Sequence, residues 1–191
     1  MRQRLAGQGA GHGFDHVERV LRLARAIQAQ TGGERLIVEL AALLHDLGDA
    51  KFNAGVERSG EFAEAILSEL GEPPDTIAHV VHIVDNLSFR KGADAAELSL
   101  EGQIVQDADR LDALGAIGIV RTIEYGATIG QPFYRSDGAS GKAGIDHFDD
   151  KLFKLRSLMK TDAGQRLAVQ REQFMQTFLK QFKSEVGMML E

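Results

Sequence analysis

The apolar residues of this 191-residue chain recur with the period of an α-helix along nearly its whole length. The first such segment starts at Phe14 and stops at Gly32, with apolar positions at helical spacing: Val17, Val20, Leu21, Ala24 and Ile27. The same spacing predicts further helices over residues 34–47, 62–70, 77–84, 100–124, 148–159 and 167–182. No segment has the alternating pattern of a strand, so the sequence predicts an all-α fold.

The chain length fits one domain, which we expect to span residues 14–191. Residues 1–13 contain four glycines and are expected to form a flexible N-terminal lead. Residues 126–145 form a long glycine-rich stretch, and irregular segments of this length are usually functional or disordered. A lid over a substrate and a disordered loop are therefore the two interpretations of this stretch.

The composition excludes several classes of function. Cysteine is absent, which excludes disulfides and thiolate metal sites, and the absence of tryptophan disfavours base-stacking surfaces. The net charge of −6 disfavours binding to long nucleic acids. Apolar stretches are too short for a membrane span, so we expect a cytoplasmic protein without membrane or nucleic-acid partners. A small anionic ligand would require local positive charge or a metal ion.

One pair of polar residues follows the most apolar of the predicted helices. His45 and Asp46 come directly after Leu44, and adjacent helical residues point about 100° apart, so no single exposed face accounts for both. Polar groups in a core must be paired or bind a metal ion. This fragment alone leaves two interpretations open, a buried hydrogen-bonded pair and part of a metal site.

Two more polar residues lie beside apolar faces of other predicted helices. His16 is one turn before Val20, where a hydrogen-bonded core histidine is the simpler interpretation. Asp109 is one turn after Val105, and Asp107 points about 200° away from it, so we expect Asp109 to face the core and Asp107 not to. An ion pair with an arginine is the structural alternative for Asp109.

Together these residues supply two imidazoles and two carboxylates from three helices. This donor set suits one hard or borderline divalent ion with open water positions, such as Mn²⁺, Fe²⁺, Mg²⁺, Zn²⁺ or Co²⁺. The residue types do not select among these ions, because affinity follows a general order and availability decides.

The ordered motifs His16, His45–Asp46 and Asp109 resemble the HD-domain superfamily of metal-dependent phosphohydrolases. The resemblance extends over residues 14–186 and is strongest to small stand-alone bacterial members. The segments that carry it are 14–20, 45–52, 86–92, 107–115, 147–161 and 171–182. It implies an all-helical, phosphodiesterase-like bundle with a central metal site, in agreement with the helical periodicity.

By position, the resemblance implies that His16, His45, Asp46 and Asp109 are the metal ligands. It implies hydrolysis of a small soluble phosphoester or phosphoanhydride, with a nucleotide as the leading substrate and pyrophosphate release from nucleoside triphosphates as the first reaction to test. A non-catalytic metal- or nucleotide-binding regulatory module is the alternative, followed by a dinuclear-iron oxygenase on the same fold. We interpret the histidines at 79 and 82 as structural or surface residues.

Catalytic and substrate-binding roles are predicted for residues around these motifs. Asp46 is expected to orient a water molecule, and Asp49 to accept a proton or position a second water. A solvated carboxylate at a helix end is the alternative for Asp49. Arg19, one turn after the first histidine, is expected to bind phosphate oxygens. The other predicted substrate-binding residues are Lys51, Asn86, Arg90, Lys91 and Asp112. For the charged ones, a solvated surface group is the alternative.

Overall fold

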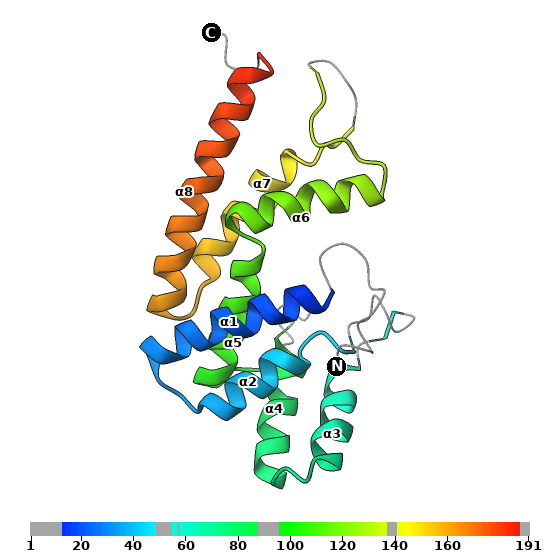
Figure 1. The fold of residues 1–191 in the computed structure, drawn as a ribbon, viewed down its shortest axis with the longest axis vertical. Helices are drawn as coiled ribbons and strands as arrows, with labels where there is room; N and C mark the ends of the chain where they lie inside the picture. The colour runs from blue at the N-terminus through cyan, green and yellow to red at the C-terminus, as the bar shows by residue number, and fades with distance from the viewer. Residues whose placement is uncertain (1–12, 49–54, 57, 88–95, 137–140, 188–191) are drawn as a thin grey trace. The chain divides into compact units, whose positions relative to one another are not determined.

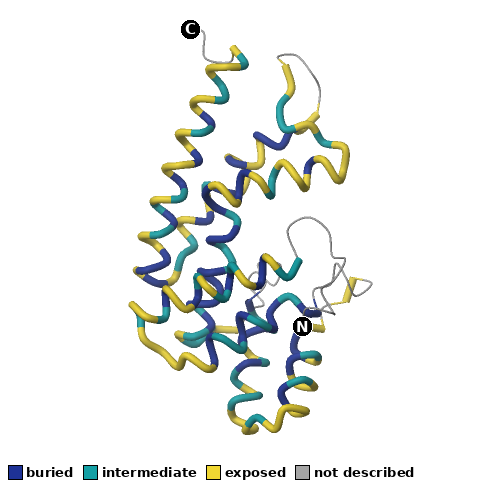
Figure 2. The backbone as a smooth tube through the Cα atoms, viewed as in Figure 1, coloured by how far each residue is buried: buried dark blue, intermediate teal, exposed yellow. Residues whose placement is uncertain are grey.

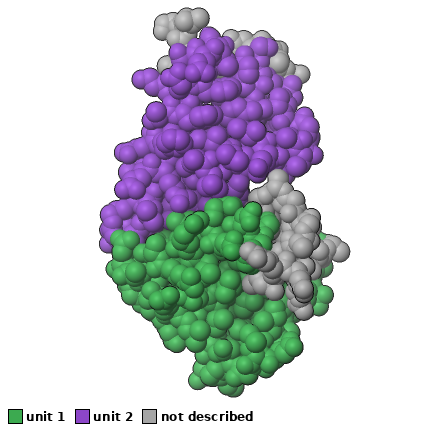
Figure 3. All heavy atoms as spheres, in the orientation of Figure 1, with its two compact units in different colours: residues 1–109 green, residues 110–191 purple. Residues whose placement is uncertain are grey.

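The computed structural model describes residues 13–48, 55–56, 58–87, 96–136 and 141–187. The chain divides into two compact units, residues 1–109 and 110–191 (Figure 3). Every regular element among the described residues is helical, which confirms the predicted all-α class (Figure 1). None of these described helices has the length and apolar character needed to span a bilayer. The single domain over 14–191 stays a prediction, and nearly all of the predicted flexible lead lies outside the described residues.

The first unit contains four complete helices and most of a fifth. They are α1 (Phe14–Thr31), α2 (Arg35–Leu44), α3 (Ser59–Glu69), α4 (Pro74–Asn86) and α5 (Leu100–Asp112). Helix α1 packs on α2, α2 packs on α4, and α3 packs on α4. Helices α3 and α4 lie side by side in this unit (Figure 1).

The turn between α1 and α2 follows from two glycines. Gly32 and Gly33 both have φ near +87°, a conformation that residues with a side chain rarely adopt. The N–H of Gly32 donates to the carbonyl of Gln28 and ends α1. Of the predicted apolar stripe of α1, Leu21 is half-buried and the other four residues are buried. Burial of each valine or isoleucine side chain contributes about 2 kcal/mol. The stripe thereby fixes which way the first turn of α1 faces.

Helix α5 is buried on nearly all sides in its second half, from Ile104 to Ala108, whereas α1 is buried on one stripe only (Figure 2). A helix surrounded in this way has no solvent face, so consecutive polar residues on it point into protein interior in different directions. The enclosure of α5 therefore determines how far Asp107 and Asp109, near its C-terminal end, are buried.

The prediction of one long helix over residues 100–124 is wrong. The structure divides it into α5 and α6 (Gly115–Thr128), with Gly115 at φ +73°. Arg171 donates to the carbonyl of Leu111, and Arg121 donates to the carbonyl of Asp112. These side chains supply the hydrogen bonds that the last carbonyl groups of α5 would receive from backbone N–H groups if the helix continued. The glycines inside the predicted helix were the sequence signal for this break.

The second unit is built around α6, α7 (Asp146–Asp150), the 3-10 helix η2 (Leu152–Leu158) and α8 (Asp162–Glu185). Helix α6 packs on α8, and η2 packs on both α7 and α8. The single helix predicted over 148–159 is therefore a short helix followed by a 3-10 helix. Thr161 is the N-cap of α8, and its hydroxyl accepts the N–H of Gly164.

The glycine-rich stretch 126–145 is shorter as a loop than predicted, because α6 continues to Thr128. Its two sides pair through backbone hydrogen bonds, from Gly144 to Pro132 and from Ile145 to Phe133. The Phe133 ring contacts three other aromatic rings of the second unit, those of Phe148, Phe178 and Phe182. The base of the stretch is thus anchored to the second unit, and residues 137–140 lie outside the described residues.

Candidate metal centre

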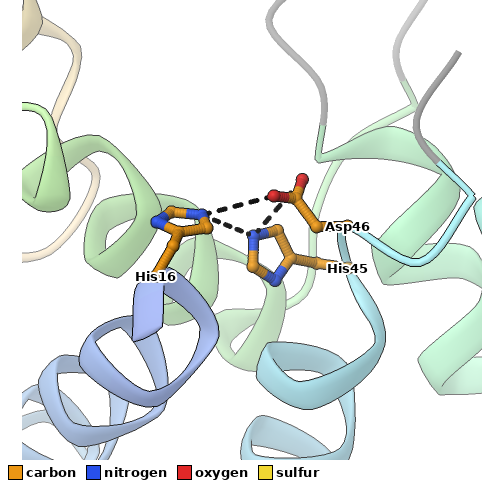
Figure 4. Close-up of side chains that lie close together, drawn as sticks. All are labelled: His16, His45 and Asp46. Carbon is orange, nitrogen blue, oxygen red and sulfur yellow. Dashed lines mark hydrogen bonds and ion pairs between the residues drawn. The ribbon is translucent and has the colours of Figure 1, made fainter. Parts of the chain in front are cut away.

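Two histidines and an aspartate lie together in the first unit (Figure 4). His16 occupies the first turn of α1, and its side chain is 1% exposed. His45 caps the C-terminus of α2, and Asp46 follows it in the turn that leaves the helix. The side chains of both residues lie near His16, although the backbone of His45 keeps helical dihedral angles.

The four predicted metal ligands are brought within a few ångströms of one another. His16 Nε2 lies 3.3 Å from His45 Nε2, 3.4 Å from Asp46 Oδ2 and 3.4 Å from Asp109 Oδ1. His45 Nε2 lies 3.6 Å from Asp46 Oδ1 and 3.9 Å from Asp109 Oδ1. Nitrogen and oxygen atoms from α1, the end of α2 and α5 therefore converge on one small volume.

The tautomer of His45 is fixed from outside this cluster. Its Nδ1–H donates to the carbonyl of Ala42 at 2.9 Å, which leaves the Nε2 lone pair facing the other three side chains. No side-chain signal in the sequence marks Ala42, because it contributes only its backbone. Lone pairs of two imidazoles and two carboxylates then face one another, and such a group requires a proton or a metal ion among them.

This donor set fits a divalent metal ion. One donor atom from each of His16, His45 and Asp46 lies within 4.8 Å of the others, and Asp109 adds a second carboxylate close to both rings. Nitrogen and carboxylate ligands of this kind bind borderline and hard divalent ions, and their chemistry does not select one of them. The cluster can thus hold one such ion.

Asp109 belongs to this cluster although its side chain is 38% exposed. Burial of its carboxyl group raises the pKa, but the hydrogen bond with His16 and the electrostatic influence of both histidines outweigh this and hold the pKa below its ordinary value. The carboxylate form, which is the form that binds metal, is therefore favoured.

The expectation that Asp107 points away from the core is wrong. Asp107 is completely buried, more so than Asp109. The prediction assumed that α5 has one buried face, but this helix is enclosed on nearly all sides. Burial therefore does not distinguish the two aspartates, whereas proximity to His16 does.

The predicted substrate-binding residues divide into three groups. Arg19 is half-buried on α1 and lines a surface hollow of about 530 Å³ with Arg22, Arg25 and two acidic residues. The side chains of Asn86 and Asp112 form hydrogen bonds or an ion pair with other parts of the protein. The Asn86 amide donates to His82 O and accepts the N–H of Ala96, and buried Asp112 binds the Arg121 guanidinium at 2.7 Å. The last group, Lys51, Arg90 and Lys91, lies outside the described residues, as does the predicted catalytic residue Asp49.

His79 and His82 have other partners, as the interpretation of them as structural residues requires. The Nε2 atom of His79 lies 2.8 Å from the Ser99 hydroxyl, and that of His82 lies 3.0 Å from the Glu97 carbonyl. Both contacts hold the segment that leads into α5. Within the part of the chain that is described, the three-residue cluster of His16 is the only group identified that can hold a metal ion.

Comparison with known proteins places this geometry in context. A family model described as the HD domain matches residues 13–114. The YpgQ protein of Bacillus subtilis is 38% identical over 184 residues, which is 95% of this chain and 88% of YpgQ. The crystal structure of YpgQ in complex with ADP has a TM-score of 0.81 at 34% identity and covers 96% of this chain and 89% of that chain.

Other solved structures are similar to the same extent. An HD-superfamily hydrolase from Bacillus thuringiensis has a TM-score of 0.81 at 38% identity and covers 97% of this chain and 92% of that chain. The Lin1889 protein from Listeria innocua has a TM-score of 0.78 at 30% identity, over 94% of this chain and 90% of that chain. The likeness extends over nearly the full length of each protein, including the part beyond residue 114.

Proposed function

Because this chain belongs to the HD-domain family, we propose that it is a metal-dependent phosphohydrolase acting on a small soluble phosphoester or phosphoanhydride. We propose further that the substrate is a nucleotide, with nucleoside triphosphates as the first compounds to test. The observation that carries the proposal is the convergence of four lone-pair donors in the first unit.

His16, His45, Asp46 and Asp109 are the proposed ligands of one divalent ion. The shared position of their donor atoms supports this assignment, and so does the Ala42 contact that turns the His45 lone pair toward the cluster. When bound, such an ion lowers the pKa of a coordinated water toward about 7 and polarises a phosphoryl oxygen.

Other residues of the chain supply orientation, proton transfer and charge. Asp46 is proposed to orient a water molecule, and Asp49 is proposed to accept the proton. Arg19, Lys51, Arg90 and Lys91 are proposed to bind phosphate oxygens, which an acidic protein needs local cations to attract. We leave Asn86 and Asp112 out of this group, because their side chains are already held by the fold.

The nucleotide assignment draws support from a relative. YpgQ has been crystallised in complex with ADP, and it is similar to this chain over nearly the full length of both. The net charge of −6 opposes contact with a long polyanion but not with one small anion at a metal centre.

The test is a turnover panel. Protein loaded with Mn²⁺, Mg²⁺ or Co²⁺ is incubated with nucleoside mono-, di- and triphosphates and with aryl phosphates, and released phosphate and pyrophosphate are measured. We expect release from at least one nucleotide, and none from an Asp46→Ala control. Absence of release across the panel, with the metal site shown to be full, would replace the hydrolase by a binding module.

A further inference from the structure

The turn that carries His45 and Asp46 ends at Gly48, which touches the start of another helix. The N–H of Arg58 donates to the carbonyl of Gly48 at 2.9 Å. A Cβ atom on Gly48 would lie 2.2 Å from the Ser59 nitrogen and 2.3 Å from the Arg58 carbonyl carbon. Backbone therefore rests directly on backbone, and the position of the turn depends on where α3 begins.

The Arg58 side chain, at the N-cap position, does not cap α3. Its guanidinium donates to the Glu61 carboxylate of the first turn at 2.8 Å, which leaves the N–H groups of that turn to other acceptors. The N–H of Gly60 instead donates to Asp85 Oδ1 at 3.0 Å, from near the C-terminal end of α4. A carboxylate in this place satisfies a free N–H of the first turn and interacts favourably with the helix dipole.

The Asp85 carboxylate lies very close to this first turn. A Cβ atom on Gly60 would lie 2.4 Å and 2.5 Å from its two oxygens, so only glycine leaves room for the contact. Gly60 and Gly48 thus allow two close contacts in series. The contact at Gly60 joins α4 to the start of α3, and the contact at Gly48 joins the start of α3 to the turn that follows α2.

We infer that Asp85 is a positioning residue for the metal centre, acting through the start of α3 and Gly48 on His45 and Asp46. The inference rests on the proposed metal ligands and assigns no contact between Asp85 and the ion. Metal ligands must be held to about half an ångström, and the turn after α2 is closed along the chain by a long hydrogen bond, from the Leu47 N–H to the Leu44 carbonyl at 3.3 Å. The cap from Asp85 supplies that constraint.

The experiment compares metal affinity in three variants. Asp85→Ala removes the acceptor, Asp85→Asn keeps an acceptor oxygen in the same place, and Thr161→Ala removes a helix cap of the same kind from α8. Mn²⁺ binding is followed by titration of the free ion in electron paramagnetic resonance, and folding by circular dichroism. Loss of one cap lowers Tm by about 2–4 °C in a chain of this size.

We expect Asp85→Ala to raise the Mn²⁺ Kd about tenfold or more, as changes in residues that orient ligands commonly do. Asp85→Asn should stay within about threefold of wild type, and Thr161→Ala should lower Tm without changing Kd. A wild-type Kd in folded Asp85→Ala would overturn the inference, as would an equal weakening in Thr161→Ala. If Asp85→Ala does not fold, Asp85→Glu takes its place, because the longer side chain does not fit against Gly60.

This outcome is separate from that of the proposed hydrolysis. Wild-type protein that binds Mn²⁺ but releases no phosphate contradicts the enzyme and leaves the positioning role intact. Wild-type turnover together with unchanged affinity in Asp85→Ala contradicts only the positioning role. Wild-type protein that binds no divalent ion contradicts both, because Asp85 then has no metal centre to position.

Discussion

The first unit brings two imidazoles and two carboxylates together, whereas the second buries two carboxylates against guanidinium groups. Asp112 is 1% exposed and lies 2.7 Å from Arg121, and buried Glu172 lies 3.2 Å from Arg156. In the cluster of His16, by contrast, the close contacts among the four side chains join groups that can each donate a lone pair to a metal ion. A buried carboxylate beside a guanidinium is explained by the fold, and a cluster of metal-ligating groups points to a bound cation.

The contrast predicts that the two kinds of polar group respond oppositely to substitution. Removing a group from the donor cluster should cost ligand affinity and little stability. Removing a partner from an ion pair of the second unit should cost stability and no affinity.

The largest effect is expected from Asp46→Ala. Loss of one proposed ligand should raise the Mn²⁺ Kd at least about a hundredfold. This increase is larger than the one of about tenfold or more expected for Asp85→Ala, because Asp85 does not bind the ion itself. The stability of the metal-free protein should change by less than about 1 kcal/mol, because one of the mutually repelling acceptors is removed. Metal titration and urea denaturation without metal measure the two quantities.

His82→Ala is the matched control for that experiment. It removes a histidine that donates to a backbone carbonyl in the same unit, and it should leave the Mn²⁺ Kd unchanged. Equal weakening in both variants would show that the affinity depends on the whole unit and not on the cluster.

The next effect is expected from Arg121→Met in the second unit. The change leaves the buried Asp112 carboxylate without its guanidinium partner, which should lower the free energy of unfolding by about 3 kcal/mol. Urea denaturation measures this loss. The Mn²⁺ Kd of the folded variant should equal that of wild type, and a tenfold change would contradict the division of roles between the two units.

The smallest effect concerns an ion-pair group nearer the surface. Glu39 on α2 accepts hydrogen bonds from Arg25 at 2.9 Å and Arg35 at 2.6 Å, and these lower its pKa to about 2. Because the carboxyl group ionises more readily in the folded protein, its stabilisation is complete above about pH 4.5 and is lost as the pH falls toward about 2. Screening by solvent limits it to about 1 kcal/mol.

Glu39→Gln tests that value. The variant should be less stable than wild type by about 1 kcal/mol at pH 7, and the difference should disappear between about pH 4.5 and 2. Thermal unfolding as a function of pH measures both. A difference that persists at pH 2 would show that packing of the side chain, and not its charge, carries the effect.

Much of the fold was predictable because helical periodicity is a local property. The stripe of α1, the end of that helix at Gly32 and the absence of strand patterns are written in neighbouring residues, and the described structure agrees with them. The candidate site was predictable for a related reason, since polar residues at apolar positions require partners wherever the chain folds. His16, His45, Asp46 and Asp109 were identified in this way and by their order along the chain.

The remaining features depended on which segments meet in space. Asp107 is buried because α5 is enclosed on nearly all sides, and a helical wheel does not show how many neighbours a helix has. The break between α5 and α6 depends on hydrogen bonds to the last carbonyl groups of α5. Arg121 donates one of them, and Arg171, which lies 60 residues further along the chain than its acceptor Leu111, donates the other. Asn86 is predicted from the sequence to bind substrate, and in the structure its side-chain amide hydrogen-bonds to the backbone of His82 and Ala96.

The sequence by itself determined the helical class and the four residues that gather into one cluster, because hydrophobic spacing and misplaced polar groups are read along the chain. Only the tertiary structure decided that the Asp85 carboxylate caps α3 and that Gly48 rests on the start of that helix. Such contacts arise between segments far apart in sequence, and a hydrogen bond or a close backbone approach between them leaves no periodic pattern in either one.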